Sequence, residues 1–515
     1  MKKLFTSALL ILSAFTMQAK DYPGNLHVSV PAMGNLEVDQ TTNVTVNKQE
    51  NNKYELVITD FNFEGMPVGT IDVKDVEFKE NGNATFLTYN GKTTIQPNST
   101  GEGDLQYQEV DLELTANMTD NELSAHIVIN AMGMDITVSF IPESKITQIP
   151  NSNFEKFHTA EFQGNTTQEA DHWHSFTSAY TTAHLYNTAR RQKQSFESSD
   201  VRTGSTSTKC LLIKSAVPMG VPANGTVTTG RIQAGSMTPT NAANCAFLNL
   251  SNKDKDDNGD PFYVQLNSTP DAITFWTRFK QGQDNLACKY ASMRAVVTDG
   301  TYYQDPENKT YNNIVCVAAN KEIEGTDKWQ QITSDFDYAT YKDNKATAKA
   351  ILVTISTNAQ PGVASSDASN PDCIYIDDLS LVYKAALSSL KFKGEELFVA
   401  GQKEYDVNAT GTYNISDIEV ASDGKGANIN VDINDVDGGS KATITITSED
   451  WRTQNTYTLN IKGSTTGIHS AKNMNYPNGV QAIYNLAGQQ VGSMTPGQVY
   501  IVKTTDGQTK KVIKK

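Results

Sequence analysis

Apolar and polar residues alternate with a period of two along much of the chain. The segments "YELVITDFNF", "TIDVKDVEF" and "DITVSF" show this alternation in the first part of the sequence. Because successive side chains of a β-strand point to opposite faces, the period predicts strands with one buried and one solvated face. Asn, Gly and Asp separate these segments, as expected for turns. The pattern therefore predicts an all-β protein.

The chain has 515 residues, which is too many for one hydrophobic core, so three or more domains are expected. The pattern divides it into five parts. They are a leader, residues 1–19; a barrel, residues 20–145; a larger β-domain, residues 146–385; a small immunoglobulin-like sandwich, residues 386–463; and a linker with a short β-rich tail, residues 464–515. The short strands and polar turns of the fourth part favour a spacer.

The first twenty residues, "MKKLFTSALLILSAFTMQAK", have the pattern of a secretory signal. Lys2 and Lys3 form the basic end, an apolar run follows, and Ala19 is a small residue at the expected cleavage point. No later run reaches the roughly 20 apolar residues of a membrane helix. These features predict a secreted protein without a membrane-spanning segment, located at the cell surface, outside the cell or in the periplasm.

The formal net charge of -15 argues against nucleic acid and anionic membranes as partners. The five cysteines have no CxxC spacing, so a structural zinc site built on them is not expected. In an oxidising compartment one or two disulfides could form, and buried free thiols are the equal alternative.

The second part contains "MPVGTIDVKDVEF" and closes with "INAMGMDITVSF". It resembles the calycin-like β-barrel domains of exported Bacteroidetes proteins. The resemblance implies a barrel with room for a small apolar ligand. A barrel packed with its own side chains is the alternative.

The third part opens with "IPNSNFEKFH" and closes with "CIYIDDLSLVYK". It resembles the Bacteroidetes "putative carbohydrate metabolism domain" family, which has a galactose-binding-like jelly roll. The resemblance implies association with a glycan or polysaccharide and establishes no reaction.

The end of the chain contains "IYNLAGQQV" and "GQVYIVKTTDGQTKKVIKK". These segments resemble the C-terminal sorting domain of the type IX secretion system. The resemblance implies the type IX secretion machinery as a partner. A final β-hairpin domain that stays attached is the alternative.

The segment "AITFWTRFK" separates into two faces. Its apolar residues lie on one side, which predicts core, while Trp276 and Arg278 share the other. A flat ring packs against the C–H face of a sugar, and a nearby cation can bond its hydroxyls. We predict a carbohydrate platform here, extended by Tyr302 and Tyr303, with Trp173 as a further candidate ring. Buried or loop-covered aromatic residues are the alternative.

Glu155, Asp377 and Asp378 lie near the two ends of the jelly-roll part. Jelly-roll carbohydrate modules often tie their first and last strands together with one structural calcium ion, and these carboxylates are the candidate ligands. Adjacent residues of a regular strand point to opposite faces, so only one of the two aspartates could join Glu155. The alternative is carboxylates that cap strand ends in water.

Two further patterns suggest metals more weakly. In "KDKDDNGDP", the residues from Asp254 to Asp260 have the spacing of a calcium loop, but Gln265 stands where a bidentate Glu is needed. In "QEADHWHSF", His172 and His174 have the spacing for one strand face, and nothing obliges His158 or His184 to come near. We therefore predict an acidic turn in the first case and strand packing, not a metal site, in the second.

Taken together, the sequence predicts non-catalytic glycan binding through the jelly-roll part. One alternative is a glycoside-active enzyme that uses jelly-roll carboxylates. Another is a structural surface adhesin. No GxSxG, HExxH or Gly-rich phosphate loop is present, which weakens the enzyme alternative.

Overall fold

The computed structural model describes residues 19–515 except 34–35, 64–65, 82, 97–107, 132, 284–286, 288, 410, 412, 464–479, 486–498, 505–508 and 514–515. The predicted leader, residues 1–19, lies outside the described residues apart from its last position. The chain divides into two compact units, one formed by residues 1–143 and 471–515 and the other by residues 144–470. The prediction of an all-β protein is confirmed.

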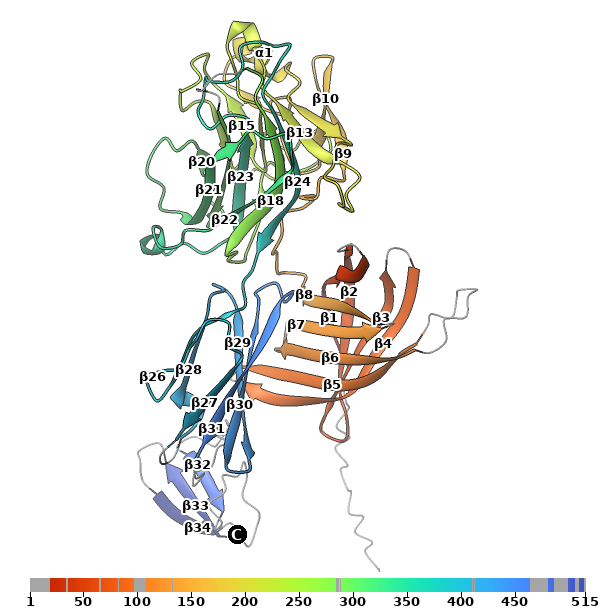
Figure 1. Ribbon diagram of the computed structural model, residues 1–515, viewed down its shortest axis with the longest axis vertical. Coiled ribbons are helices and arrows are strands. Elements are labelled where there is room, and N and C mark those ends of the chain that lie inside the picture. Colours follow the sequence, from red (N-terminus) through yellow and green to blue (C-terminus); the bar gives the residue numbers. More distant parts are fainter. Residues whose placement is uncertain are drawn as a thin grey trace, which may run out of the picture. The chain divides into compact units, whose positions relative to one another are not determined.

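The first unit contains a closed barrel of antiparallel strands in the order β1 to β8, with β8 paired back to β1 (Figure 1). The strands are β1 Lys20–Val30, β2 Leu36–Lys48, β3 Tyr54–Phe63, β4 Met66–Asn81, β5 Ala84–Gln96, β6 Gln108–Met118, β7 Leu123–Ala131 and β8 Met134–Pro142, with the short 3-10 helix η1 Pro31–Met33 after β1. Buried apolar side chains from all eight strands form one cluster. This core favours the packed-barrel alternative.

The second unit begins with a β-sandwich. Its strands are β9 Phe157–Phe162, β10 Asn165–Ala170, β11 Tyr180–Thr181, β12 Ser195–Ser198, β13 Cys210–Lys214, β14 Thr226–Thr228, β15 Arg231–Ala234, β16 Cys245–Phe247, β17 Val264–Gln265, β18 Ala272–Lys280, β19 Tyr290–Thr298, β20 Gln304–Asp305, β21 Ile314–Glu324, β22 Gln330–Asp335, β23 Ala350–Ser356 and β24 Cys373–Val382. The helices are α1 Asn187–Arg190 and the 3-10 turns η2 His184–Tyr186, η3 Pro218–Gly220 and η5 Lys342–Asn344.

Two five-stranded sheets face each other across the main core of this sandwich. One has the order β12-β13-β24-β18-β22, and the other has the order β14-β23-β19-β21 with β17 on β23. Phe275 and Phe279 of β18 and Val353 of β23 are fully buried in the same cluster, which joins the two sheets. The predicted apolar face of "AITFWTRFK" is thus part of the core. A further sheet, β11-β15-β16-β20, and the pair β10-β9 complete the domain.

A smaller sandwich follows in the second unit. Its strands are β25 Leu387–Phe392, β26 Glu395–Glu396, β27 Glu404–Asn408, β28 Ile418–Ser422, β29 Asn428–Val436, β30 Gly439–Thr447 and β31 Gln454–Lys462, with the 3-10 turn η6 Ile415–Asp417. Its sheets, β26-β25-β28 and β27-β31-β30-β29, share one hydrophobic core. The tail contains an antiparallel sheet of β32 Val480–Asn485, β33 Val499–Thr504 and β34 Thr509–Ile513.

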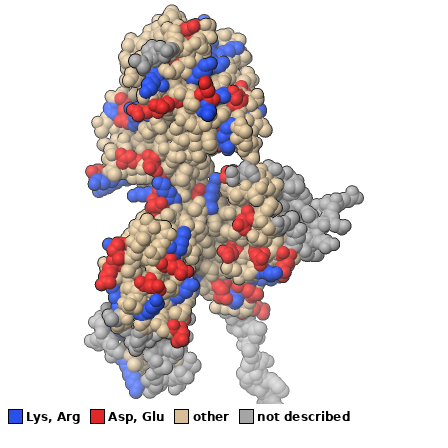
Figure 2. Space-filling view, in the orientation of Figure 1, with Lys and Arg blue, Asp and Glu red and all other residues tan. Residues whose placement is uncertain are grey.

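Four cysteines lie in the described part of the chain, Cys210, Cys245, Cys316 and Cys373, and all four are free thiols. Burial raises the pKa of Cys210, Cys245 and Cys316 to about 12, so these thiols stay protonated and behave as small apolar groups. No helix in the described ranges combines the length and the apolar character needed to span a lipid bilayer. On the face shown in Figure 2, described acidic and basic side chains are interspersed.

Candidate functional site

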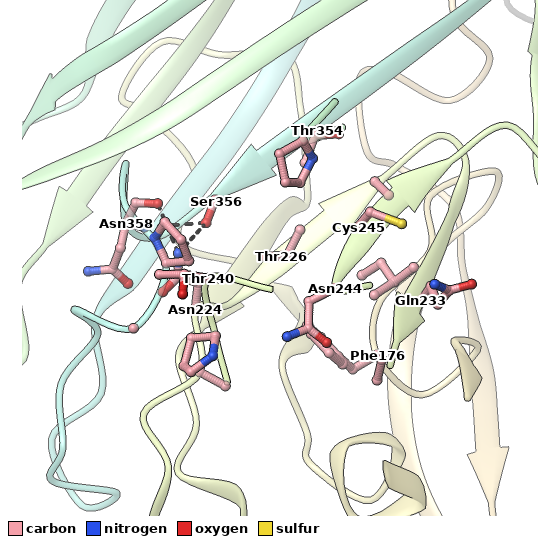
Figure 3. A pocket seen from close by; sticks show the side chains of 18 of the residues that line it. Phe176, Asn224, Thr226, Gln233, Thr240, Asn244, Cys245, Thr354, Ser356 and Asn358 are labelled. Carbon is pink, nitrogen blue, oxygen red and sulfur yellow. Dashed lines mark hydrogen bonds between the residues drawn. The ribbon is translucent and has the colours of Figure 1, made fainter. Parts of the chain in front are cut away.

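A cavity of about 450 Å³ in the second unit is lined by residues of both the β14-β23-β19-β21 sheet and the β11-β15-β16-β20 sheet. Alternation along β23 explains which side chains reach it. Val353 and Ile355 point into the main core, so Thr354 and Ser356 point to the opposite face, where they line the cavity (Figure 3). The cavity therefore lies on the outer face of one sheet of the sandwich, under a second layer of chain.

An amide group anchors one side of the cavity. Asn224 donates from Nδ2 to Ser356 Oγ at 3.3 Å and to the carbonyl oxygen of Asn358 at 3.0 Å (Figure 3). Its Oδ1 has no hydrogen-bond partner. The contacts hold the loop before β14 against the end of β23.

A group of charged side chains forms another part of the lining. Arg294 of β19 contacts Glu307 at 2.7 Å and Asp305 at 3.7 Å, and Lys321 of β21 lies in the same lining. Burial raises the pKa of the Asp305 carboxyl; the positive charge of Arg294 opposes this shift and the negative charge of Glu307 adds to it. The cavity thus brings together two cations and two carboxylates, and burial raises the pKa of the Asp305 carboxyl.

Most of the remaining wall is apolar. It includes two aromatic rings and several prolines and aliphatic side chains. These are Phe176, Tyr186, Pro218, Val221, Pro222, Ile232, Met237, Pro239, Pro306 and Pro361. A lining with apolar walls and a few polar groups is typical of small-molecule sites, and 450 Å³ is within their usual size.

The structure places the predicted platform on the other sheet. Trp276 and Arg278 point away from the main core on β18 and do not line the cavity. The guanidinium of Arg202 lies 4.8 Å from the centre of the Trp276 ring, and that of Arg278 lies 4.3 Å from the centre of the Tyr375 ring. Arg278 also pairs with Asp200. Protein cations therefore already occupy the rings of this face.

Two of the predicted sugar-binding rings are buried, which corrects the prediction for them. Trp173 is 0% exposed and packs on Phe154 in the main core, with 5.2 Å between ring centres. Tyr303 is also 0% exposed, and its hydroxyl donates to Glu307. Neither ring presents a face to a ligand. Tyr302 is 46% exposed and stays a candidate contact.

The predicted calcium ligands are held by protein groups. Glu155 accepts hydrogen bonds from the backbone nitrogens of Thr208 at 2.8 Å and Lys209 at 3.1 Å. Asp378 forms an ion pair with Arg202 at 2.8 Å. Among the described residues, two groups bring three possible metal ligands within 4.8 Å of one another, and neither group includes Glu155, Asp377 or Asp378. The calcium site stays a prediction.

Asp377, the neighbour of Asp378 on β24, is buried, and its Oδ2 has no hydrogen-bond partner. Burial, and then the negative charge of Asp378, raises the pKa of Asp377 to about 7. The aspartate is therefore poised to change its charge near neutral pH.

His172 and His174 do not share a strand face, which corrects that interpretation. His172 has a positive φ of 68°, and its Nδ1 lies 3.2 Å from Asp260. His174 is fully buried, and its Nε2 lies 3.3 Å from Asp256. His184 is exposed in η2.

The acidic segment forms a turn, in agreement with the sequence interpretation. Asp256 Oδ1 accepts hydrogen bonds from the backbone nitrogens of Asn258 and Asp260. Asp254 pairs with Arg231. These carboxylates thus face different partners, which is not the arrangement of a calcium loop.

The sequence interpretation missed the cavity residues. A usable signal was present, because polar Ser292 and Arg294 alternate with apolar residues in "ASMRAVV", and Thr354 and Ser356 do so in "VTIS". Polar side chains on a strand face that is covered by another layer indicate a lined cavity. The covering layer itself cannot be recognised from these local patterns.

The described chain is therefore an all-β, multidomain protein whose second unit holds a cavity with mixed polar and apolar walls. Residues 19–142 match the family model of the calycin-like beta-barrel domain, which confirms that prediction for the barrel. No curated protein matches the chain.

Three solved structures are similar to parts of the chain. A "putative glycoside hydrolase" from Bacteroides vulgatus is 15% identical, over 46% of this chain and 98% of that chain, with a TM-score of 0.32. A second, from Bacteroides thetaiotaomicron, is 13% identical, over 60% and 99%, with a TM-score of 0.31. The M60 catalytic domain with two CBM51 domains from Clostridium perfringens ZmpB is 10% identical, over 95% and 45%, with a TM-score of 0.17. At these TM-scores the similarities carry no argument about activity.

Proposed function

We propose that the second unit binds a carbohydrate, without catalysis, in the cavity beside β19 and β23. The observation that supports this is a 450 Å³ cavity that combines apolar walls with amide, hydroxyl and charged groups. The C–H faces of a sugar pack on apolar and aromatic side chains, and its hydroxyls need donors and acceptors around the rim. Asn224, Ser356 and Arg294 supply such groups, and Phe176 and Tyr186 supply rings.

A glycan array probed with the full chain tests this proposal. The Ser356→Trp variant places a large ring in the cavity, and Thr456→Trp at an exposed position of β31 is the matched control. We expect the wild type and the control to bind the same glycan and the Ser356→Trp variant to lose it. Equal binding by both variants would place the sugar elsewhere, with the Trp276 face as the alternative location.

Glycoside hydrolysis is the second candidate, and the charged part of the lining favours it. Glycosidases need two carboxylates across the sugar, one of them with a raised pKa. Asp305 has a raised pKa through burial, and Glu307 lies beside the same Arg294. Release of a chromophore from reporter glycosides by the wild type, and its loss in both Asp305→Asn and Glu307→Gln, would establish this reaction. No release by the wild type would exclude it for the glycosides tested.

We propose that the protein is exported by means of its N-terminal leader and that the type IX secretion machinery recognises its C-terminal tail. The described tail strands β32, β33 and β34 form a small antiparallel sheet around Ile483, Tyr500 and Val502. The resemblance of "IYNLAGQQV" and "GQVYIVKTTDGQTKKVIKK" to type IX sorting domains supports this proposal. A structural adhesin, which would bind cells or itself and no glycan, is the alternative to a glycan-binding role.

A further inference from the structure

A second cluster of buried polar side chains lies in the second unit, and none of its members lines the cavity. His158 comes from β9, Glu169 from β10, His174 from the segment after β10, and Asp256 from the acidic turn. The fold therefore brings together side chains that are almost 100 positions apart in the sequence.

The ligand-type atoms of these side chains converge. His158 Nε2 lies 3.4 Å from Asp256 Oδ2, and His174 Nε2 lies 3.3 Å from the same oxygen. One ligand atom each from His158, Glu169 and Asp256 lies within 4.8 Å of the other two.

Polar atoms of this cluster have no hydrogen-bond partners. This holds for His158 Nε2, Glu169 Oε2 and Asp256 Oδ2, and also for both ring nitrogens of the neighbouring His174. The side chains of Asp256 and His174 are 0% exposed and that of His158 is 10% exposed. A buried carboxylate oxygen without a hydrogen-bond partner is unfavourable unless a nearby cation compensates its charge. A divalent cation would balance the charges of Glu169 and Asp256.

The other oxygen of each carboxylate is fixed by the protein. Glu169 Oε1 accepts hydrogen bonds from Ser175 N at 2.8 Å and Ser178 Oγ at 3.1 Å. Asp256 Oδ1 accepts from Asn258 N at 2.9 Å and Asp260 N at 2.7 Å. Asp256 is thus held from behind while its Oδ2 lies beside the two histidines, and Glu169 keeps Oε2 without a hydrogen bond from the protein.

His158 is oriented in the same way. Its Nδ1 lies 3.0 Å from Asp171 Oδ1, which leaves Nε2 facing the cluster. A carboxylate behind a histidine is the usual arrangement around a metal-bound imidazole, because it fixes the tautomer and the ring direction. His174 packs against Phe262, with 4.5 Å between ring centres, and faces Asp256 from another side.

We propose that His158, Glu169 and Asp256 bind one divalent transition-metal ion, with zinc the best match, and that His174 positions Asp256. An imidazole ligand favours zinc over calcium or magnesium, which prefer oxygen alone. Tetrahedral bonds of about 2.0–2.1 Å separate ligand atoms by about 3.4 Å, as between His158 and Asp256. The site is buried, so its role is structural: it joins β9 and β10 to the acidic turn.

Metal analysis of the purified full chain tests the site. After removal of metals with a chelator, we expect dialysis against zinc to restore one zinc ion per chain and to raise the melting temperature. The variants His158→Gln, Glu169→Gln and Asp256→Asn should bind zinc at least about 100-fold more weakly, and His174→Gln about 10- to 100-fold more weakly. His184→Gln, at an exposed histidine, is the control and should keep the zinc.

Wild-type protein without stoichiometric zinc, cobalt or manganese would overturn the proposal, and so would a variant of Asp256 that keeps full affinity. Should the variants fail to fold, X-ray absorption by the zinc-loaded wild type gives an independent answer. We expect one imidazole among nitrogen and oxygen ligands. A spectrum with sulfur or without imidazole would contradict the site.

Discussion

Asp377 shows how a single buried carboxyl makes stability depend on pH. Its pKa is raised to about 7 from an ordinary 3.8, first by burial and then by the charge of Asp378. Between these values the folded protein holds a proton that the unfolded chain releases. Stability contributed by this group is therefore complete below about pH 4 and is lost as the pH rises toward 7.

We expect Asp377→Asn to reduce the loss of stability between pH 4 and pH 8, because the amide cannot ionise. Melting temperatures of the wild type and the variant across this range measure the effect. Asp343→Asn, at an exposed position in η5, is the control and should keep the wild-type profile. Parallel profiles for the wild type and Asp377→Asn would contradict the raised pKa.

The two tryptophans of the sandwich differ in surroundings, and their truncations should differ in cost. Trp173 is fully buried in the main core, so Trp173→Ala is expected to cost about 3–5 kcal/mol. Trp276 is half-buried beneath Arg202, and Trp276→Ala is expected to cost about 1–3 kcal/mol. Hydrogen exchange in strands β18 and β24 of the full chain compares the two. An equal or larger loss of protection in Trp276→Ala would show that its ring carries core packing.

At the scale of elements, closure of the barrel depends on a close approach between β1 and β8. A Cβ atom added at Gly24 would lie 2.4 Å from the carbonyl oxygen of Ile141 and 2.4 Å from the ring of Phe140. Both contacts are far inside van der Waals distance, and one of them is backbone that cannot turn away. Only glycine fits at this position.

Gly24→Ala should therefore weaken the β1–β8 pairing by about 1–3 kcal/mol. Hydrogen exchange of residues 20–30 and 134–142 in the full chain is expected to speed up, with the second unit unchanged. Ser29→Ala on the same strand is the control and should change stability by less than about 0.5 kcal/mol. Unchanged protection in Gly24→Ala would mean that β8 can shift to make room.

Period-two patterns predicted individual strands well, because the apolar residues of each strand show which of its faces is buried. The segment "AITFWTRFK" is an example, since it forms β18 with Phe275 and Phe279 in the core. The same reasoning was wrong for "QEADHWHSF", where it placed His172 and His174 on one strand face. His174 contacts Asp256 of a distant turn, and a local pattern cannot predict a contact across more than 80 residues.

At the scale of the whole molecule, the succession of strands along the chain could be predicted, whereas the cavity could not. The strands of the barrel, of the two sandwiches and of the tail follow one another in the described sequence, so changes in pattern mark them. The cavity forms where the β11-β15-β16-β20 layer covers the outer face of another sheet. That covering depends on tertiary packing and cannot be predicted from local patterns. Trp276 was predicted as the sugar-binding ring because it alternates with core residues along its strand.

Export by the proposed type IX route would depend on the tail of the chain. Deleting residues 480–515 removes the three tail strands and is expected to leave the protein in the periplasm. Surface labelling and cell fractionation measure the distribution. A deletion inside the sandwich of residues 386–463 would impair folding as well as export. Replacing only the lysines of the final segment is therefore the better companion variant. Equal surface levels of truncated and full protein would contradict a sorting role.

The central claim is that the second unit binds carbohydrate in the cavity. Calorimetric titration of the full chain with its array-selected glycan tests it most directly, in the wild type, Phe176→Ala, Tyr186→Ala and Trp276→Ala. We expect each cavity variant to bind about 10-fold or more weakly, because about 1.4 kcal/mol of ring contact is lost, and Trp276→Ala to bind like the wild type. Loss of binding in Trp276→Ala alone, with both cavity variants unaffected, would contradict the claim and move the sugar to the outer face of β18.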